Sequence, residues 1–125
     1  MTLTRINYAR SRRVLELEFA DGISGELSAE FLRVHSPSAE VRGHGPGQET
    51  LQTGKRDVQV SAINPVGHYA IQLVFDDGHD SGLFSWDYLR ELCSKQEELW
   101  QSYLDQLAAA GASRDSDIQV LNFTP

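Results

Sequence analysis

The sequence predicts an α+β fold: a mainly antiparallel β-sheet or sandwich built from two strand–turn–strand–helix units, with C-terminal helices packed on it. The main observation is an internal repeat, because the residue pattern of 15–33 recurs over 71–90. A second observation is the helical spacing of apolar residues after residue 95. The two units could share one sheet or pack as a sandwich.

The first copy of the repeat contains strand, turn and cap signals in order. Strands with alternating apolar and polar residues are expected at three places: residues 3–8, 14–19 and 23–27. Asp21-Gly22 predicts a hairpin turn between the last two, because glycine accepts a positive φ without a Cβ clash. Ser28 is expected to cap a short helix over 29–34.

The second copy repeats these signals. Its strands are expected at three places: residues 58–65, 69–75 and 82–84. Asp77-Gly78 predicts the turn, and Ser85 is expected to cap a helix that begins at Trp86. The second copy has one residue more than the first before its capping serine. The simplest alignment places this extra residue at His79.

Two further helical signals follow. Ser94 and Glu97 form a capping-box pattern just before a new apolar run, which predicts a helix break near Cys93–Ser94. A second helix is expected over 95–110, with Gly111 as its stop.

The chain is expected to form a single domain over residues 1–111. Residues 35–55 are rich in Gly, Pro and Ser, which predicts a long flexible loop with a functional or disordered character. Residues 112–125 are expected to form a C-terminal tail.

Composition excludes several functions. The formal net charge is -7, so binding to nucleic acid or to an anionic membrane surface is disfavoured. No apolar run is long enough to span a bilayer, and no signal peptide is visible. Cys93 is the only cysteine, so an internal disulfide or a cysteine-based zinc site cannot form. These features fit a cytoplasmic protein.

Candidate site residues cluster in the turn of the second copy. Asp77, His79 and Asp80 carry carboxylates and an imidazole that could hold a divalent metal. Aspartates in turns are also common because they bond nearby backbone N–H groups. His35 and His44 in the 35–55 loop could be ligands or simply solvated.

No pattern of catalytic residues is present. An iron-oxygenase facial triad requires Asp or Glu two residues after a histidine, and none of the four histidines has one. The sequence also lacks a phosphate-binding loop and a nucleophile pattern. It therefore does not favour an enzyme.

Three segments resemble a known family. Residues 32–41, 65–70 and 75–89 read LRVHSPSAEV, PVGHYA and FDDGHDSGLFSWDYL. They resemble the γ-butyrobetaine hydroxylase-like N-terminal domain, also called DUF971, and the chain looks like its small stand-alone bacterial members. The resemblance implies a compact β-rich domain with helices.

The resemblance also implies a zinc site of three cysteines and one histidine. The cysteine positions correspond here to Ser36, Ser38 and Val41, and the histidine corresponds to His79. Serine hydroxyls are poor ligands and valine is none, so we expect this zinc site to be broken.

Two functions remain after these exclusions. The first is a non-catalytic binding or accessory domain, linked through its family to oxygenase or iron–sulfur biochemistry, with a protein partner or a homo-oligomer. The alternative is a metal-binding protein in which zinc or iron is held near His79, with His35, His44, Asp77 and Asp80 as helpers.

Overall fold

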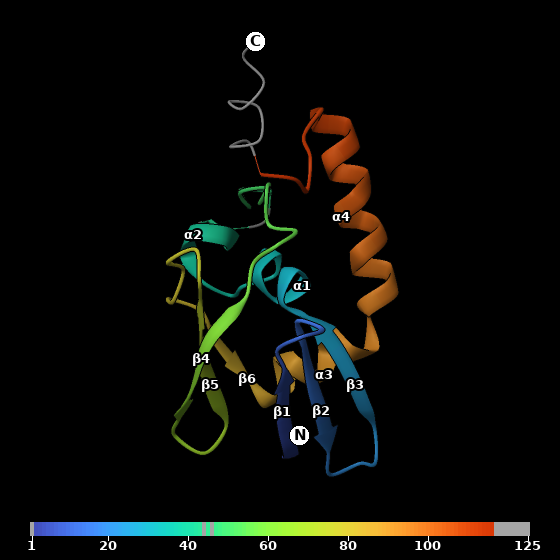
Figure 1. Ribbon diagram of the computed structural model, residues 1–125. Helices are drawn as coiled ribbons and strands as arrows, with labels where there is room; N and C mark the ends of the chain where they lie inside the picture. The colour runs from blue at the N-terminus through green and yellow to red at the C-terminus, as the bar shows by residue number, and fades with distance from the viewer. Residues whose placement is uncertain (1, 44, 46, 117–125) are drawn as a thin grey trace.

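The computed structural model describes residues 2–43, 45 and 47–116, and it contains two three-stranded antiparallel sheets together with helices (Figure 1). The strands are β1 (Leu3–Ala9), β2 (Val14–Phe19), β3 (Ser24–Ser28), β4 (Val60–Val66), β5 (Ala70–Phe75) and β6 (Leu83–Ser85). The helices are α1 (Ala29–Val34), α2 (Ala39–Arg42), α3 (Trp86–Ser94) and α4 (Gln96–Ala110). The α+β prediction is confirmed, and the two repeated units form separate sheets.

The repeat is longer than the sequence pattern indicates, because it includes the first strand of each sheet. The strand orders are β1-β2-β3 and β4-β5-β6. The β1–β2 ladder shifts register after Leu3, and the β4–β5 ladder shifts after Val60, which is the equivalent position. Both sheets therefore have the same register shift at the start of their first strand. We call residues 3–36 unit 1 and residues 60–93 unit 2.

Each unit ends in a serine-capped helix, as predicted. The Ser28 hydroxyl accepts a hydrogen bond from the Phe31 N–H at 3.0 Å, and the Ser85 hydroxyl accepts one from the Tyr88 N–H at 3.0 Å. Each bond satisfies one N–H that the first turn of a helix leaves free.

The turn hydrogen bonds show which residues of the two units correspond. The Ile23 N–H donates to Asp21 Oδ1 at 3.1 Å, and the His79 N–H donates to Asp77 Oδ1 at 3.2 Å. His79 therefore takes the place of Ile23, and the inserted residue of unit 2 is Asp80. The prediction that His79 is the extra residue is wrong. The insertion leaves three residue pairs between β5 and β6, where β2 and β3 have five.

The two units make reciprocal contacts, as expected for copies related by an approximate two-fold axis. Arg33 of unit 1 donates from Nε to Asp77 Oδ2 of unit 2 at 2.9 Å. Its equivalent in unit 2, Arg90, donates from Nε to Asp21 Oδ2 of unit 1 at 3.1 Å. The sequence repeat is therefore also a repeat of contacts across the interface between the units.

A pair of glycines shows the same reciprocity. A Cβ on Gly25 would clash with the Cys93 side chain, and a Cβ on Gly82 would clash with the Ser36 hydroxyl. Gly25 and Gly82 are equivalent positions, and so are Ser36 and Cys93. Each unit thus uses a glycine to let the end of the other unit approach closely.

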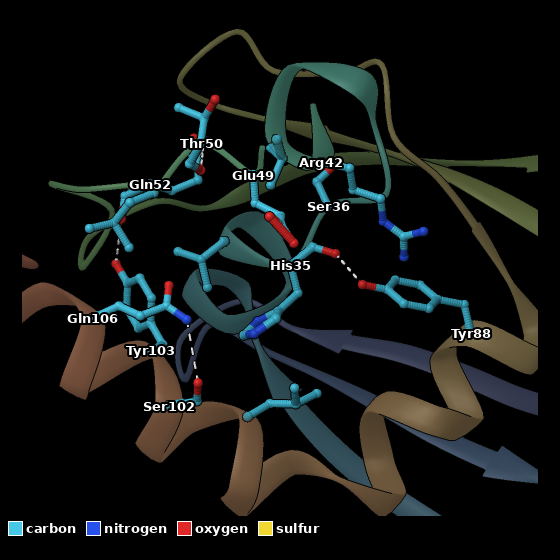
Figure 2. Close-up of a pocket in the computed structure, with 14 residues that line it drawn as sticks. His35, Ser36, Arg42, Glu49, Thr50, Gln52, Tyr88, Ser102, Tyr103 and Gln106 are labelled. Atoms are coloured by element: carbon cyan, nitrogen blue, oxygen red, sulfur yellow. Dashed lines mark hydrogen bonds between the residues drawn. The ribbon is translucent and has the colours of Figure 1, made fainter. Parts of the chain in front are cut away.

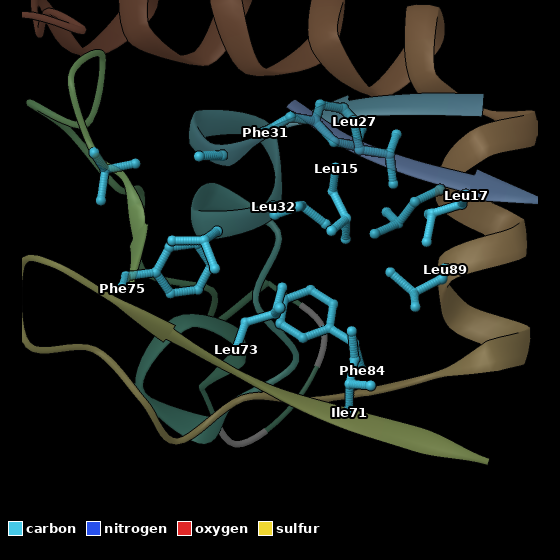
Figure 3. Packing of buried hydrophobic residues seen from close by; sticks show 14 of the residues in the cluster. Leu15, Leu17, Leu27, Phe31, Leu32, Ile71, Leu73, Phe75, Phe84 and Leu89 are labelled. Carbon is cyan, nitrogen blue, oxygen red and sulfur yellow. The ribbon is translucent and has the colours of Figure 1, made fainter. Parts of the chain in front are cut away.

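Both units contribute to one hydrophobic core, in which strand and helix side chains point toward one another (Figure 3). The largest of these side chains are Leu15, Leu17, Phe19, Leu27, Phe31, Leu32, Ile71, Leu73, Phe75, Phe84, Leu89 and Leu92. The alternating pattern predicted for residues 14–19 is confirmed in β2, where Leu15, Leu17 and Phe19 are buried.

The predicted break between the C-terminal helices is confirmed, since α3 ends at Ser94 and α4 begins at Gln96. The predicted capping box of Ser94 and Glu97 is wrong. The Ser94 hydroxyl donates to the Arg90 carbonyl at 3.2 Å, and the N-cap residue of α4, Lys95, makes no side-chain cap bond. Gly111 ends α4 in the left-handed conformation, as predicted, with φ of 63°. No helix in the described part of the chain is long and apolar enough to cross a membrane.

The described residues of the segment between the units include a short helix and several backbone hydrogen bonds. We call residues 37–59 the connection. It contains α2, so the prediction of a loop throughout 35–55 is wrong over that helix. The Gly54 N–H also donates to the Ser113 carbonyl at 3.0 Å, which ties the connection to the residues after α4.

Part of the predicted C-terminal tail is described. Residues 112–116 follow α4 and lie against the connection, and the Arg114 carbonyl accepts from the Arg56 N–H at 3.0 Å. Arg114 also forms a two-bond ion pair with the buried Glu30 of α1. Residues 117–125 and His44 lie outside the described residues.

Candidate functional site

The turn after β5 places the His79 side chain inside the protein. The His79 carbonyl accepts from the Phe75 N–H at 2.9 Å, and the two rings pack with centroids 6.0 Å apart. His79 is 5% exposed, whereas its equivalent in unit 1, Ile23, is 43% exposed. The inward histidine is therefore specific to unit 2.

Three polar side chains around the start of α2 surround the His79 ring. Nε2 lies 2.8 Å from Ser36 Oγ and 3.4 Å from Ser38 Oγ, and Nδ1 lies 3.3 Å from Glu40 Oε2. An ionised carboxylate only accepts hydrogen bonds, so Nδ1 carries the proton. Nε2 then accepts from a serine hydroxyl, and the neutral ring has a partner at both nitrogens.

The electrostatic surroundings keep this imidazole neutral. Burial lowers the pKa of His79 below its usual value, and the positive charge of Arg33 lowers it further. Glu40 and Asp77 raise this pKa but do not reverse the net shift. The neutral ring is compatible with the hydrogen bonds to Ser36 and Glu40, since it accepts at Nε2 and donates at Nδ1.

Ser36, His79 and Glu40 have the order hydroxyl, imidazole, carboxylate that serine hydrolases use. Ser36 is fully buried, and the backbone of Gly82 covers its hydroxyl. A hydrolase requires a substrate carbonyl within reach of the nucleophile, and the buried Ser36 hydroxyl is closed to one. We therefore interpret this cluster as a hydrogen-bond network that fastens the connection to the β5–β6 turn.

The same residues do not fit a zinc ion. The structure brings Ser36 and Ser38 to Nε2 of His79, but both are neutral hydroxyls, and Val41 offers no donor atom. Glu40 lies at Nδ1, on the other side of the ring. Zinc prefers thiolate, imidazole and carboxylate ligands. In residues 2–43, 45 and 47–116, no group of three or more His, Cys, Asp or Glu side chains could hold a metal.

His35 does not join the His79 cluster. Its Nδ1 is 2.9 Å from the Phe31 carbonyl, and its ring packs on the Phe31 ring and against Tyr103. A carbonyl only accepts, so Nδ1 donates this bond. Burial lowers the pKa of His35, which also keeps this ring neutral.

In the described part of the chain, neither Asp77 nor Asp80 bonds to the His79 ring. Asp77 Oδ2 accepts from Arg33 and from Lys55 Nζ at 2.6 Å. Burial raises the pKa of Asp77, but hydrogen bonds from Lys55 and the His79 N–H, with the charge of Arg33, lower it to about 2. Asp80 is exposed, and its backbone carbonyl accepts from Gln72. No described contact joins the Asp80 carboxylate to His79.

A pocket of about 420 Å³ opens beside this cluster, between the connection and α4 (Figure 2). The Tyr103 hydroxyl donates to the Gln52 carbonyl at 2.8 Å, which links α4 to the connection across the pocket. The Tyr88 hydroxyl donates to the His35 carbonyl at 2.5 Å on the side of α3. Burial raises the pKa of Tyr103 to about 12, so its hydroxyl stays protonated.

Known proteins resemble this chain over most of its length. The model of the family "Gamma-butyrobetaine hydroxylase-like, N-terminal" matches residues 6–90. The chain therefore belongs to this family, as its motifs indicate. No curated protein matches the chain.

Solved structures agree with the fold. One protein with an NMR solution structure is 48% identical, with a TM-score of 0.80 and coverage of 99% of this chain and 98% of its own. A second NMR structure is 51% identical, with a TM-score of 0.79 and coverage of 92% and 86%. A crystal structure of a DUF971 protein of unknown function from Acidithiobacillus ferrooxidans is 42% identical, with a TM-score of 0.62 and coverage of 73% and 91%.

Sequence reasoning missed the pocket and the roles of Glu40, Tyr88 and Tyr103. The pocket combines residues from the connection, α3 and α4, and no local pattern relates such distant segments. One signal was available for the contacts between the units. Arg33 and Arg90 are equivalent in the repeat, as are the two turn aspartates, and this pairing predicts reciprocal ion pairs.

Proposed function

We propose that this chain is a non-catalytic binding domain that serves a partner protein. Its family suggests a partner from oxygenase or iron–sulfur biochemistry. The observation that carries the proposal is a difference between the outer faces of the two sheets, which share one scaffold but differ in charge.

The outer face of the first sheet is charged. Asn7, Glu16 and Glu26 form one row across β1, β2 and β3. Asn7 Nδ2 donates to Glu16 Oε1 at 2.7 Å, and Arg12 contacts the carboxylates of both glutamates. Solvated charges of this kind are typical of a face that stays in water.

The equivalent row of the second sheet carries no charge. It consists of Asn64, Gln72 and Leu83, and Asn64 Nδ2 donates to Gln72 Oε1 at 3.2 Å. Leu83, which takes the place of Glu26, is 52% exposed. Tyr69 in the β4–β5 turn is 70% exposed and Val66 at the end of β4 is 37% exposed.

Unit 2 therefore presents an exposed leucine and an uncharged glutamine where unit 1 presents two glutamates. Exposed apolar side chains that gather on one part of a surface mark interaction sites. Three of the four exposed large hydrophobic residues in the described part of the chain belong to unit 2: Val66, Tyr69 and Leu83. A partner with an apolar contact surface would bury them.

The repeat supplies a matched test. Leu83→Glu introduces the residue that unit 1 has at the equivalent position, so the scaffold should accept it with a stability change within about 0.5 kcal/mol. The tagged full chain and this variant would be expressed in the source cells, with Glu26→Gln as the control. We expect at least one stoichiometric protein to co-purify with the wild type and the control but not with Leu83→Glu.

Self-association is measured in parallel by light scattering of the purified chain. The proposed contact surface is wrong if the wild type, Leu83→Glu and Glu26→Gln recover the same partners and the wild type stays monomeric at high concentration. If the wild type forms concentration-dependent dimers and Leu83→Glu abolishes them, the partner is a second copy of this chain.

The alternative predicted from the sequence is a metal-binding protein, which the neutral hydroxyls of Ser36 and Ser38 at Nε2 of His79 do not favour. Its test is a titration of the tag-free protein with zinc and with ferrous iron, followed by the histidine NMR signals. Saturation of the His79 signals at micromolar metal would support it. Unchanged signals of all four histidines would exclude it.

A further inference from the structure

The pocket between the connection and α4 contains a cation and an anion that are not paired. Arg42 and Glu49 both line it, and both side chains are exposed. Neither forms an ion pair with a residue that the structure describes. The Arg42 guanidinium carbon lies 4.7 Å from the centre of the Tyr88 ring, and Figure 2 shows this group on one side of the pocket and Glu49 above His35.

His35 adds a hydrogen-bond acceptor to the pocket. Its Nδ1–H is used by the Phe31 carbonyl, so Nε2 carries the free lone pair of the neutral ring. No described residue bonds to Nε2. A ligand that reaches this nitrogen must therefore bring an N–H or O–H donor.

One part of the remaining wall is apolar, whereas Thr50, Gln52, Ser102 and Gln106 make the rest of it polar. Val34, Val41 and Tyr103 line the pocket with mostly buried side chains, and Leu51 and Leu99 extend this wall. Apolar walls with a few placed polar groups are the usual composition of small-molecule sites, and a volume of about 420 Å³ lies in their range.

We propose that this pocket binds a free amino acid with a large apolar side chain, as its zwitterion. The carboxylate pairs with Arg42, the ammonium group pairs with Glu49 and donates to His35 Nε2, and the side chain packs on the apolar wall. A zwitterion satisfies both unpaired charges at once. It also has no net charge, so the protein's charge of -7 does not repel it as it repels a simple organic acid.

The test uses phenylalanine and two analogues that each lack one charge. 3-Phenylpropionate has no ammonium group, and 2-phenylethylamine has no carboxylate. Each is titrated into the full chain while the amide NMR signals of the pocket residues are followed. We expect a Kd of about 1 mM or tighter for phenylalanine and at least about tenfold weaker binding of both analogues.

Two variants test which side chain pairs with each charged group of the ligand. Arg42→Gln should weaken phenylalanine to the level of 2-phenylethylamine and leave the amine unaffected. Glu49→Gln should weaken phenylalanine to the level of 3-phenylpropionate. N,N,N-trimethylphenylalanine keeps both charges but has no N–H, so it should also bind more weakly, which tests whether Glu49 and His35 accept hydrogen bonds from the ammonium group.

The proposal is overturned if all three compounds bind equally, if none gives a saturable shift, or if the shifts fall outside the pocket. It is independent of the partner surface of unit 2. Leu83→Glu should leave phenylalanine binding unchanged, and Arg42→Gln should leave partner recovery unchanged, so each proposal can fail without the other.

Discussion

Arg33 donates from Nε to Asp77 Oδ2 at 2.9 Å across the interface between the two units. The equivalent pair, Arg90 and Asp21, repeats this contact in the other direction at 3.1 Å. The first pair is more deeply placed, because the Arg33 side chain is 9% exposed and the Arg90 side chain is 24% exposed. One molecule therefore contains the same ion pair in two environments.

The two environments predict different costs for the same substitution. Asp77→Asn leaves the buried Arg33 without its carboxylate and removes the partner of Lys55, so we expect the free energy of unfolding to fall by about 2 kcal/mol. Asp21→Asn should cost less, because water screens the more exposed pair. Urea unfolding of both variants measures the difference, and equal losses would contradict this account of burial.

The low pKa of Asp77 predicts a pH dependence. Its pKa is about 2 in the folded chain, and an unfolded aspartate has a pKa of about 3.9. The stability that ionised Asp77 contributes is present above the unfolded value and is lost as pH falls toward the folded value. The stability difference between wild type and Asp77→Asn should therefore shrink between about pH 4 and pH 2. Urea midpoints at several pH values test this, and a constant difference would refute it.

Gly78 provides a test of the turn. Its φ is 91°, and a Cβ built there would meet no atom within 4 Å. Gly78→Val should therefore destabilise through backbone strain alone, by about 1–3 kcal/mol. Gly22→Val, with φ of 84° at the equivalent turn, should have a similar effect. An unchanged melting temperature for Gly78→Val would show that this turn adopts another conformation.

The broken zinc site can be tested by rebuilding it. Replacing Ser36, Ser38 and Val41 together with cysteine should create a site for about one zinc ion per chain, with His79 as the fourth ligand. The larger side chain at position 36 has a precedent, because Cys93 packs against the equivalent glycine in the other unit. Bound zinc is measured by elemental analysis after dialysis.

The control for this design is the same triple variant with His79→Ala, which should bind zinc more weakly. If the triple variant takes up no more zinc than the wild type, the four positions do not converge as the resemblance implies.

Local signals predicted much of the fold. The caps at Ser28 and Ser85, the glycine turns and the stop at Gly111 depend on residues close in sequence, and all are confirmed. The Ser94 cap failed for a local reason as well. A serine hydroxyl can bond to the carbonyl four residues earlier instead of capping the next helix, and Ser94 does so.

The site was only partly predictable. The comparison of the two copies identified His79 as a candidate but placed the insertion one residue too early. The sequence spacing fits an insertion at His79 or at Asp80, and only the turn hydrogen bonds distinguish the two alignments. Glu40 was not identified as a partner of His79, since 39 positions along the chain separate the two and α2 was expected to be part of a loop.

The exchange of contacts between the units has a consequence for folding. The turn aspartate of each half finds its arginine only in the other half, and the same holds for the glycines against Ser36 and Cys93. Neither half can therefore form all of its contacts alone, although each contains three strands and a helix. The domain should lose its structure in one concerted step, with amides of both sheets exchanging with solvent at a common free energy.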